Sequence, residues 1–227
     1  MGNGLILNDQ YNIGHICTRQ QVEAGRGEKV AMRFITPAME RVDYTFRDLD
    51  LGSSRFANVL AGLGFAPADI FFTFLPKMPE QFFAFLGALK AQVIAGTLFS
   101  NFGEEALLDR LGDSRAKGII TKKHFLKKLN RIWEGLPELK YIILVDIDDD
   151  LAPNVLSYRK LMEAASDRFT APLTGPPPPL AVPARTGFPR PARIPGPLSP
   201  PSSPPPCAPR SNPHPCRRSS CPGAGTS

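Results

Sequence analysis

Residues 71–102 read FFTFLPKMPEQFFAFLGALKAQVIAGTLFSNF, and this stretch decides the fold. It opens with a short apolar run that ends at Pro76, and such a run without polar alternation is typical of a strand buried on both faces. Pro79 suits the first position of a helix, with Glu80 behind it near the positive end of the helix dipole. A second apolar run at 93–99 predicts the returning strand. Strand, crossover helix and second strand predict a right-handed parallel unit.

The helix between these two strands carries large apolar side chains around most of its circumference. These side chains are Phe82, Phe83, Phe85, Leu86 and Leu89. A helix that is apolar all round is typically enclosed by other elements. The sequence therefore predicts a buried helix here and not an amphipathic one.

Strand and helix patterns alternate on both sides of this unit. Thr45 is a good helix N-cap with Asp48 three residues on, and Gly64 followed by Pro67 ends that helix. Strands are predicted at 29–35, 118–121 and 140–146, and helices at 11–22, 46–63, 104–111, 122–133 and 157–165. The alternation predicts an α/β domain of three layers with a mainly parallel sheet.

Charge divides the chain of 227 residues into two unlike parts. The formal net charge of +6 comes from the region after Asp167, which holds 7 Arg and neither Lys nor any acidic residue. The part before it is nearly neutral, so nothing in it indicates a nucleic-acid surface. We predict a polar lead-in at 1–26, a globular domain at 27–167 and a separate tail at 168–227.

The tail has an unusual composition. Proline supplies 19 of the 56 residues from Pro172 to the end, which is incompatible with a packed core and predicts disorder. In the same stretch, 48 residues are Pro, Ala, Ser, Thr, Arg, Gly or Cys, all encoded with C or G at the second codon base. Asp, Glu and Lys, which need A there, do not occur in it. We hypothesise that the tail is translated in a shifted reading frame.

The cysteines and apolar segments indicate a cytoplasmic protein. Cys17 stands alone in the front part, and the three tail cysteines lack the paired spacing of metal ligands, so neither a disulfide framework nor a zinc site is expected. We expect no signal peptide, because no charged-then-apolar leader opens the sequence. The longest apolar runs are far shorter than the ~20 residues of a membrane span.

Three local patterns suggest chemistry, and in each case a structural explanation is the better one. Residues 62–64 read Gly-Leu-Gly, but they end a helix, whereas a phosphate-binding loop follows a strand and opens a helix. The acidic run at 146–150 lacks the Gly and distal Glu of a calcium loop, which favours a solvated loop. His15 and Cys17 have no visible partner group for nucleophilic catalysis.

The central stretch and its flanks carry a family resemblance. Phe-Leu-Pro-x-x-Pro-Glu at 74–80, Phe-Leu-Gly-Ala-Leu-Lys-Ala at 85–91 and the segment 95–111 resemble, in this order, the N-terminal part of AMP-forming acyl-CoA synthetases. The acetate–CoA ligase branch of this adenylate-forming superfamily looks most similar. The resemblance runs from about Lys29 to Asp146.

The resemblance implies an enzyme that activates a carboxylate with ATP and Mg²⁺ and passes the acyl group to coenzyme A (CoA). The family's Ser/Thr/Gly-rich phosphate loop is due just beyond Arg168, and this sequence does not contain it there. The later adenine-binding segments and the catalytic Lys of the small C-terminal domain are also absent. We therefore assign no catalytic residue and no metal ligand, and expect the chain to be an inactive fragment that needs no cofactor of its own.

Without the catalytic motifs, the resemblance still implies part of a contact with CoA. The turn at 99–103, with Ser100 and Asn101, and basic residues on the following helix correspond to positions that approach the CoA nucleotide. Lys127 falls at one basic position, whereas Asn130 with Arg131 beside it stands at the other. A solvated basic helix face is the alternative explanation for these lysines and arginines.

Two further hypotheses remain open. The proline-rich tail contains Pro-x-x-Pro spacings, which would suit an interaction protein that docks on SH3-type domains. A free-standing nucleotide-binding α/β protein is disfavoured, because no glycine-rich loop follows a predicted strand. For the ligase fragment, the expected partners are a small carboxylate and CoA, with neither nucleic acid nor membrane.

Overall fold

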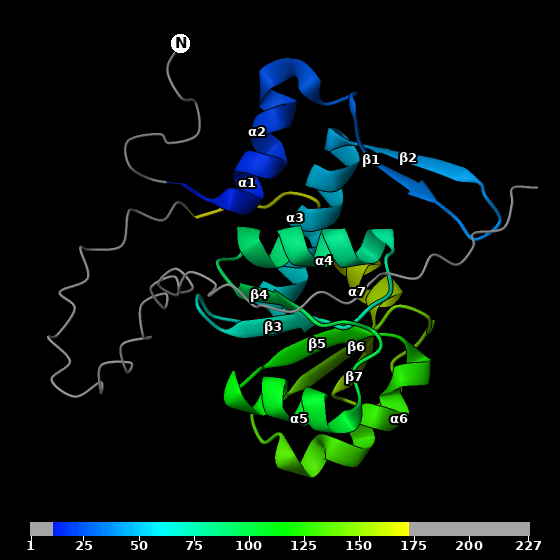
Figure 1. Cartoon of the computed structure of the whole chain (residues 1–227). Helices are drawn as coiled ribbons and strands as arrows, with labels where there is room; N and C mark the ends of the chain where they lie inside the picture. The colour runs from blue at the N-terminus through cyan, green and yellow to red at the C-terminus, as the bar shows by residue number, and fades with distance from the viewer. Residues whose placement is uncertain (1–10, 173–227) are drawn as a thin grey trace, which may run out of the picture. The chain divides into compact units, whose positions relative to one another are not determined.

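The computed structural model of the protein describes residues 11–172, and its centre is one parallel sheet (Figure 1). Five strands form it: β3 (Ile70–Thr73), β4 (Ile94–Thr97), β5 (Gly118–Thr121), β6 (Tyr141–Leu144) and β7 (Val155–Ser157). They lie in the order β4-β3-β5-β6-β7, and every neighbouring pair is parallel. The predicted parallel sheet is therefore confirmed.

Helices cover both faces of this sheet, so the three-layer prediction is also confirmed. On one face lie α3 (Phe46–Gly62), α4 (Pro79–Lys90) and α7 (Tyr158–Ala164); on the other lie α5 (Glu104–Asp113) and α6 (Lys123–Ile132), which runs into the 3₁₀ turn η2 (Trp133–Gly135) (Figure 1). Strand side chains alternate between the two apolar cores. Ile119 packs in the core under α5 and α6, whereas Ile120 packs in the core under α3 and α4.

The lead-in residues are helical and precede a small hairpin. They form α1 (Ile13–Cys17), α2 (Arg19–Gln21) and the π-helical turn η1 (Val22–Arg26), within which Gly25 adopts a φ of 76°. The chain then forms β1 (Val30–Ile35) and β2 (Arg41–Thr45), an antiparallel pair separate from the main sheet. The sequence predicted β1 and missed β2.

The ends of α3 match their prediction. The Thr45 hydroxyl accepts a hydrogen bond from the Asp48 amide at 3.1 Å, and the Asp48 carboxylate accepts one from the Thr45 amide at 2.8 Å. This reciprocal capping box satisfies two amides that the first turn leaves open. Beyond the helix, Gly64 has a φ of 72°, which the absence of a Cβ permits.

The prediction that α4 is buried all round is wrong for its large side chains. The fully buried positions on the helix are chiefly small ones, Ala84, Gly87 and Ala88. They allow close approach to α3, since a Cβ on Gly87 would lie 2.7 Å from the Ser53 carbonyl oxygen. Phe82 is instead 42% exposed, whereas the Phe83 ring faces α3 and occupies the space where a Cβ on Gly52 would lie.

The predicted tail at 168–227 lies almost wholly outside the described residues. The predictions that it is disordered and translated in a shifted reading frame therefore also concern residues outside the described range. No helix among residues 11–172 is both long enough and apolar enough to cross a membrane.

Candidate functional site

Strand order identifies the part of the sheet where a ligand is expected. The chain passes from β3 outward to β4 and then returns across β3 to β5, so the winding direction reverses between β3 and β5. In open parallel sheets, ligands bind beyond the carboxyl ends of the strands at such a reversal. The turn after β4 and the start of α6 after β5 both lie at this edge of the sheet.

Two contacts hold the turn at 99–103 near α6. The ammonium of Lys128 donates a 3.0 Å hydrogen bond to the Phe102 carbonyl oxygen. The guanidinium of Arg131 donates to the Glu104 carboxylate, at the first position of α5, with a distance of 2.6 Å. The guanidinium carbon of Arg110 lies 4.5 Å from the centre of the Phe102 ring. The turn is therefore fixed by cations from two helices.

The structure brings together some of the predicted CoA residues. Ser100 and Asn101 share the turn, where Ser100 is half-buried and Asn101 is exposed. Lys127 and Arg131 lie one helical turn apart on α6 and are both exposed, but Arg131 is already paired with Glu104. Asn130, the residue at the second family position, lines a separate hollow of about 460 Å³ beside Leu126 and Trp133.

Lys128 is the basic residue that the sequence analysis missed. It is half-buried and makes the direct α6 contact to the turn. A signal for it was present, because Lys128 lies three residues after Phe125, which packs against the apolar core. Its ammonium also lies 5.5 Å from the centre of the Phe125 ring. That spacing places Lys128 closer to the sheet than Lys127.

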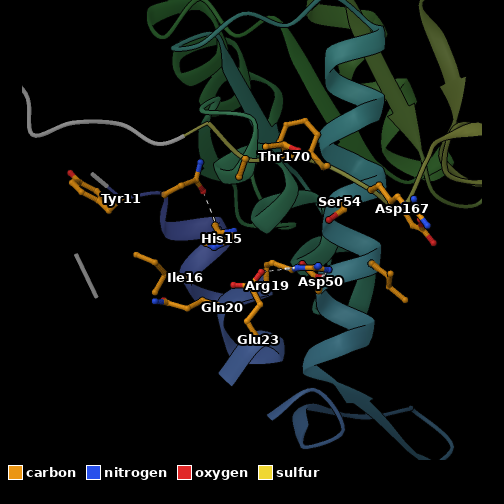
Figure 2. Close-up of a pocket in the computed structure, with 15 residues that line it drawn as sticks. Tyr11, His15, Ile16, Arg19, Gln20, Glu23, Asp50, Ser54, Asp167 and Thr170 are labelled. Carbon is orange, nitrogen blue, oxygen red and sulfur yellow. Dashed lines mark hydrogen bonds and ion pairs between the residues drawn. The ribbon is translucent and has the colours of Figure 1, made fainter. Parts of the chain in front are cut away.

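A larger cavity of about 840 Å³ lies elsewhere, between the lead-in helices, α3 and the segment 167–171 (Figure 2). His15, Arg19, Gln20, Asp50 and Ser54 point toward it in Figure 2. None of the four predicted CoA residues lines it. The size is ordinary for a ligand pocket, so its chemistry has to decide what it can do.

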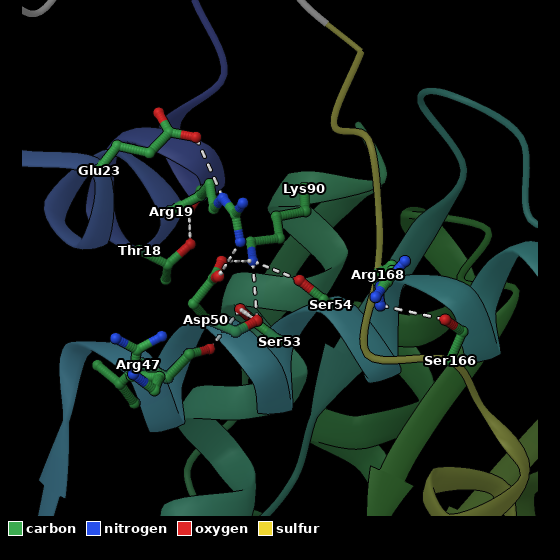
Figure 3. Close-up of polar contacts among 12 residues, drawn as sticks. Thr18, Arg19, Glu23, Arg47, Asp50, Ser53, Ser54, Lys90, Ser166 and Arg168 are labelled. Atoms are coloured by element: carbon green, nitrogen blue, oxygen red, sulfur yellow. Dashed lines mark hydrogen bonds and ion pairs between the residues drawn. The ribbon is translucent and has the colours of Figure 1, made fainter. Parts of the chain in front are cut away.

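The wall of this cavity contains a buried ion pair (Figure 3). The ammonium of Lys90 donates to the Asp50 carboxylate at 2.8 Å, to the Asp50 carbonyl oxygen at 3.0 Å and to the Ser54 hydroxyl at 2.9 Å. Arg19 approaches the other Asp50 oxygen at 3.4 Å and also pairs with Glu23 at 3.1 Å. Burial lowers the pKa of the Lys90 ammonium, and Asp50 partly offsets this effect.

The donors of the Lys90 ammonium are fully used. Three acceptors use the three donors of the Lys90 ammonium, and both oxygens of Asp50 face a cation. Both charged groups are thus positioned by contacts within the protein. The arrangement therefore joins α2, α3 and α4 and does not resemble a reaction centre.

The acidic run after β6 consists partly of structural caps. Asp146 accepts a 2.7 Å hydrogen bond from the Lys123 amide at the start of α6, and Asp150 accepts one of 2.7 Å from the Ser157 amide. Within residues 11–172 no group of three or more His, Cys, Asp or Glu side chains is arranged to hold a metal ion. Asp146 and Asp150 are thus engaged in capping bonds and are not arranged as metal ligands.

Comparison with known proteins gives the same family as the resemblance. The pattern of the AMP-binding enzyme family matches residues 18–200. Acetyl-coenzyme A synthetase of Bacillus subtilis (strain 168) is 32% identical over 161 residues, which are 70% of this chain and 28% of that protein. The human mitochondrial acyl-coenzyme A synthetase ACSM5 is 26% identical over 182 residues, 78% of this chain and 31% of that protein. The chain belongs to the AMP-binding enzyme family.

Solved structures agree in fold. An acyl-CoA synthetase of Brucella canis superposes with a TM-score of 0.65 at 27% identity, over 73% of this chain and 30% of that one. The anthranilate CoA ligase AuaEII, solved with anthranoyl-AMP, gives a TM-score of 0.62 at 23% identity, with the same coverage of each chain, and supports the fold alone. The chain spans less than a third of the length of these relatives.

Proposed function

We propose that this chain is the N-terminal part of an AMP-forming ligase that joins acetate or another short-chain carboxylate to CoA. The family match and the acetyl-coenzyme A synthetase among the relatives support this proposal. In the complete reaction, a carboxylate oxygen attacks the α-phosphorus of ATP and pyrophosphate leaves. The CoA thiol sulfur then attacks the acyl carbon, and AMP leaves with the oxygen that formed the mixed anhydride. ATP, Mg²⁺ and CoA are thus cofactors and substrates of the complete enzyme, which we place in the cytoplasm.

The part of this chemistry that we assign to the chain is a contact with the CoA nucleotide. The observation that carries the proposal is the fixed turn at 99–103, held against α6 by Lys128. Ser100 and Asn101 offer hydrogen-bond donors, and Lys127 and Arg131 offer positive charge for phosphate groups. Because Arg131 is shared with Glu104, we expect Lys127 to supply the larger part of the phosphate attraction.

Direct binding tests this assignment. CoA should bind the purified chain weakly by calorimetry, and Lys127→Ala should weaken binding by about two- to fivefold, since an exposed charge contact is worth ~0.2–1 kcal/mol. Lys140→Ala is the matched control, because Lys140 is also exposed and lies after α6, away from the turn. Equal effects of the two substitutions would mean nonspecific charge attraction, and absence of CoA binding would overturn the assignment.

We also propose that the chain alone does not form an acyl-adenylate. Within residues 11–172, no glycine-rich loop follows a strand to hold the phosphates of ATP. Acetate-dependent exchange of pyrophosphate into ATP should therefore equal the value without enzyme, with the complete Bacillus subtilis relative as positive control. Exchange clearly above that background would refute the inactive-fragment proposal.

The SH3-type interaction hypothesis has no support from the structure or the relatives. It rests on tail residues that lie outside the described range. The family membership explains the described part of the chain without it.

A further inference from the structure

The two edge strands of the main sheet, β7 and β4, differ in whether their outward backbone groups are hydrogen-bonded. At the β7 edge, the residues whose backbone groups point away from β6 already have partners. The Val155 carbonyl oxygen accepts a 2.9 Å hydrogen bond from the Leu151 amide, and the Ser157 amide donates to Asp150 at 2.7 Å. The preceding loop thus closes this edge, which is a common protection against unwanted strand pairing.

The β4 edge is open among the described residues. The amides of Ile94 and Leu98 donate to β3, to the carbonyl oxygens of Asp69 at 2.8 Å and of Thr73 at 2.8 Å. Backbone groups alternate along a strand, so Ala95 and Thr97 direct theirs to the outer side. Within residues 11–172, β4 pairs with β3 and with no other strand.

Sequence around this edge lacks the usual deterrents to pairing. Residues 91–103 contain no charged residue and no proline. Ile94 is 53% exposed and Phe99 is 71% exposed. Edge strands that stay solvated normally carry Lys, Pro or a bulge. An open, uncharged and partly apolar edge strand of this kind is therefore expected to pair with another strand.

The chain's own continuation is a poor cover. The side-chain amide of Gln92 donates to the Pro172 carbonyl oxygen at 3.3 Å, so the described chain ends beside the start of β4. The next residues include four consecutive prolines at 176–179. Proline has no N–H to donate to a strand ladder, so these four residues bring no donor for the outer carbonyl groups of β4.

We propose that β4 pairs with β4 of a second copy, antiparallel about a two-fold axis. In this register Gly96 lies opposite Gly96 of the second copy. Ala95 then lies opposite Thr97 of the second copy, and Thr97 opposite its Ala95. Each of these two pairs forms two backbone N–H···O=C hydrogen bonds. Ile94 then lies across from Leu98 of the second copy. Gly96 suits the close central position, because the Phe72 ring already occupies the space where its Cβ would be.

This two-fold pairing limits the assembly to two copies of the chain. A two-fold contact uses the same edge on both chains and leaves no open edge at its centre. The remaining edges are the two β7 strands, which their own loops close. The assembly is a dimer with one continuous sheet.

Mass measurement and two substitutions test the proposal on the full chain. Sedimentation equilibrium should give twice the 24.8 kDa of one chain, with dissociation on dilution. Ile94→Lys and Ala95→Pro should each raise the dissociation constant at least about tenfold, the first by burying a charge and the second by removing an outward N–H while sparing the bonds to β3. Leu151→Lys is the matched control, since Leu151 is 52% exposed at the closed edge. It should leave the dimer intact.

Hydrogen exchange supplies a readout that does not depend on how the variants fold. In the wild-type chain the Thr97 amide should exchange more slowly as protein concentration rises. The Ser157 amide, which is bonded to Asp150 within the chain, should exchange at a rate independent of concentration. A monomer at every concentration, an assembly larger than a dimer, or a dimer that persists in both Ile94→Lys and Ala95→Pro would each overturn the proposal.

Discussion

The ammonium of Lys90 lies 2.8 Å from the carboxylate of Asp50, and their side chains are only 2% and 5% exposed. Neither residue lies in a loop, since Lys90 ends α4 and Asp50 lies in the first turns of α3. A pair buried this deeply is strongly destabilising when only one partner is removed.

Lys90→Met should therefore lower the free energy of unfolding by about 3–5 kcal/mol in urea titrations, because it leaves the Asp50 carboxylate buried with only Arg19, which is 3.4 Å away and 55% exposed. The double variant Lys90→Met with Asp50→Leu should recover part of this loss. Lys160→Met is the control, as Lys160 is 58% exposed and should cost less than about 1 kcal/mol. Equal losses for Lys90→Met and Lys160→Met would contradict the structural role of the buried pair.

Gly87→Ala should destabilise the chain by about 1–3 kcal/mol, since a Cβ there meets the Ser53 carbonyl oxygen at 2.7 Å and the Phe56 Cβ at 2.8 Å. Gly62→Ala is the matched helical control, because a Cβ at Gly62 meets nothing within 4 Å. It should be neutral or stabilise by up to about 1 kcal/mol. Thermal unfolding of the two variants side by side measures the difference, and a tolerated Gly87→Ala would refute the close α3–α4 contact.

Tyr158 should make the chain sensitive to alkali. Burial raises the pKa of its phenol above the ordinary 10.0, and the charges of Glu80 and Tyr44 add to this effect. Above about pH 10 the unfolded chain releases the proton while the folded chain keeps it, so stability falls as pH rises. Tyr158→Phe should remove that part of the decline. The lowered pKa of Lys90 acts in the opposite direction, because stability then rises with pH, but this effect is common to both proteins.

Urea midpoints of wild type and Tyr158→Phe between about pH 8 and 11 measure this difference. Tyr141→Phe is the control and should keep the decline, because it leaves Tyr158 in place. Parallel pH profiles for wild type and Tyr158→Phe would show that the phenol ionises as easily in the folded chain as in the unfolded one.

Asn58 should control proteolysis at the end of the described chain. Its side-chain amide donates to the carbonyl oxygens of Ser166 at 2.7 Å and Arg168 at 2.9 Å. Limited digestion of the wild type with a nonspecific protease should leave a core that includes residues 166–172. Asn58→Ala should move the cut to the amino-terminal side of Ser166, whereas Asn130→Ala, at an exposed position on α6, should not. An unchanged fragment pattern would show that these bonds do not hold the segment.

The coding DNA tests the shifted-frame hypothesis for the tail. Downstream of the codon for Arg168, one of the two other frames should encode a Ser/Thr/Gly-rich loop ending in Pro-Lys-Gly, followed by more synthetase sequence. If neither frame does, the tail is a genuine segment. The family match extends to residue 200, beyond the predicted end of the globular domain at residue 167. The coding DNA therefore also tests where the synthetase sequence ends.

Local signals were sufficient to predict most of the fold. The observed bounds of β5, Gly118–Thr121, match the prediction, and the strand is buried at every position. The start of α4 followed from Pro79, and the capping box followed from Thr45 and Asp48. The predictions failed where a strand lacks a long buried apolar run. β2 carries Arg41 and Asp43 and has no buried residue, and β7 has only three residues.

The candidate site was less predictable for a different reason. The sequence showed that 122–133 has a basic face, but not which lysine reaches the turn, because that depends on where the turn after β4 places Phe102. The Lys90–Asp50 pair joins residues 40 apart, and no local pattern indicates it. The spacing of Lys90 three residues after the buried Gly87 was the only available hint.

The side-chain amide of Asn12 donates to the carbonyl oxygens of Lys90 at 3.0 Å and Pro172 at 3.1 Å, residues 78 and 160 positions further along the chain. Synthesis on a ribosome proceeds from the N-terminus, so Asn12 emerges long before either acceptor exists. The interior strand β3 likewise cannot pair on its second side until β5 is synthesised, 45 or more residues further on. Until then the uncharged residues 91–103 are outside the ribosome beside an incomplete sheet. Nascent chains of this protein are therefore expected to need chaperone protection at that stage of translation.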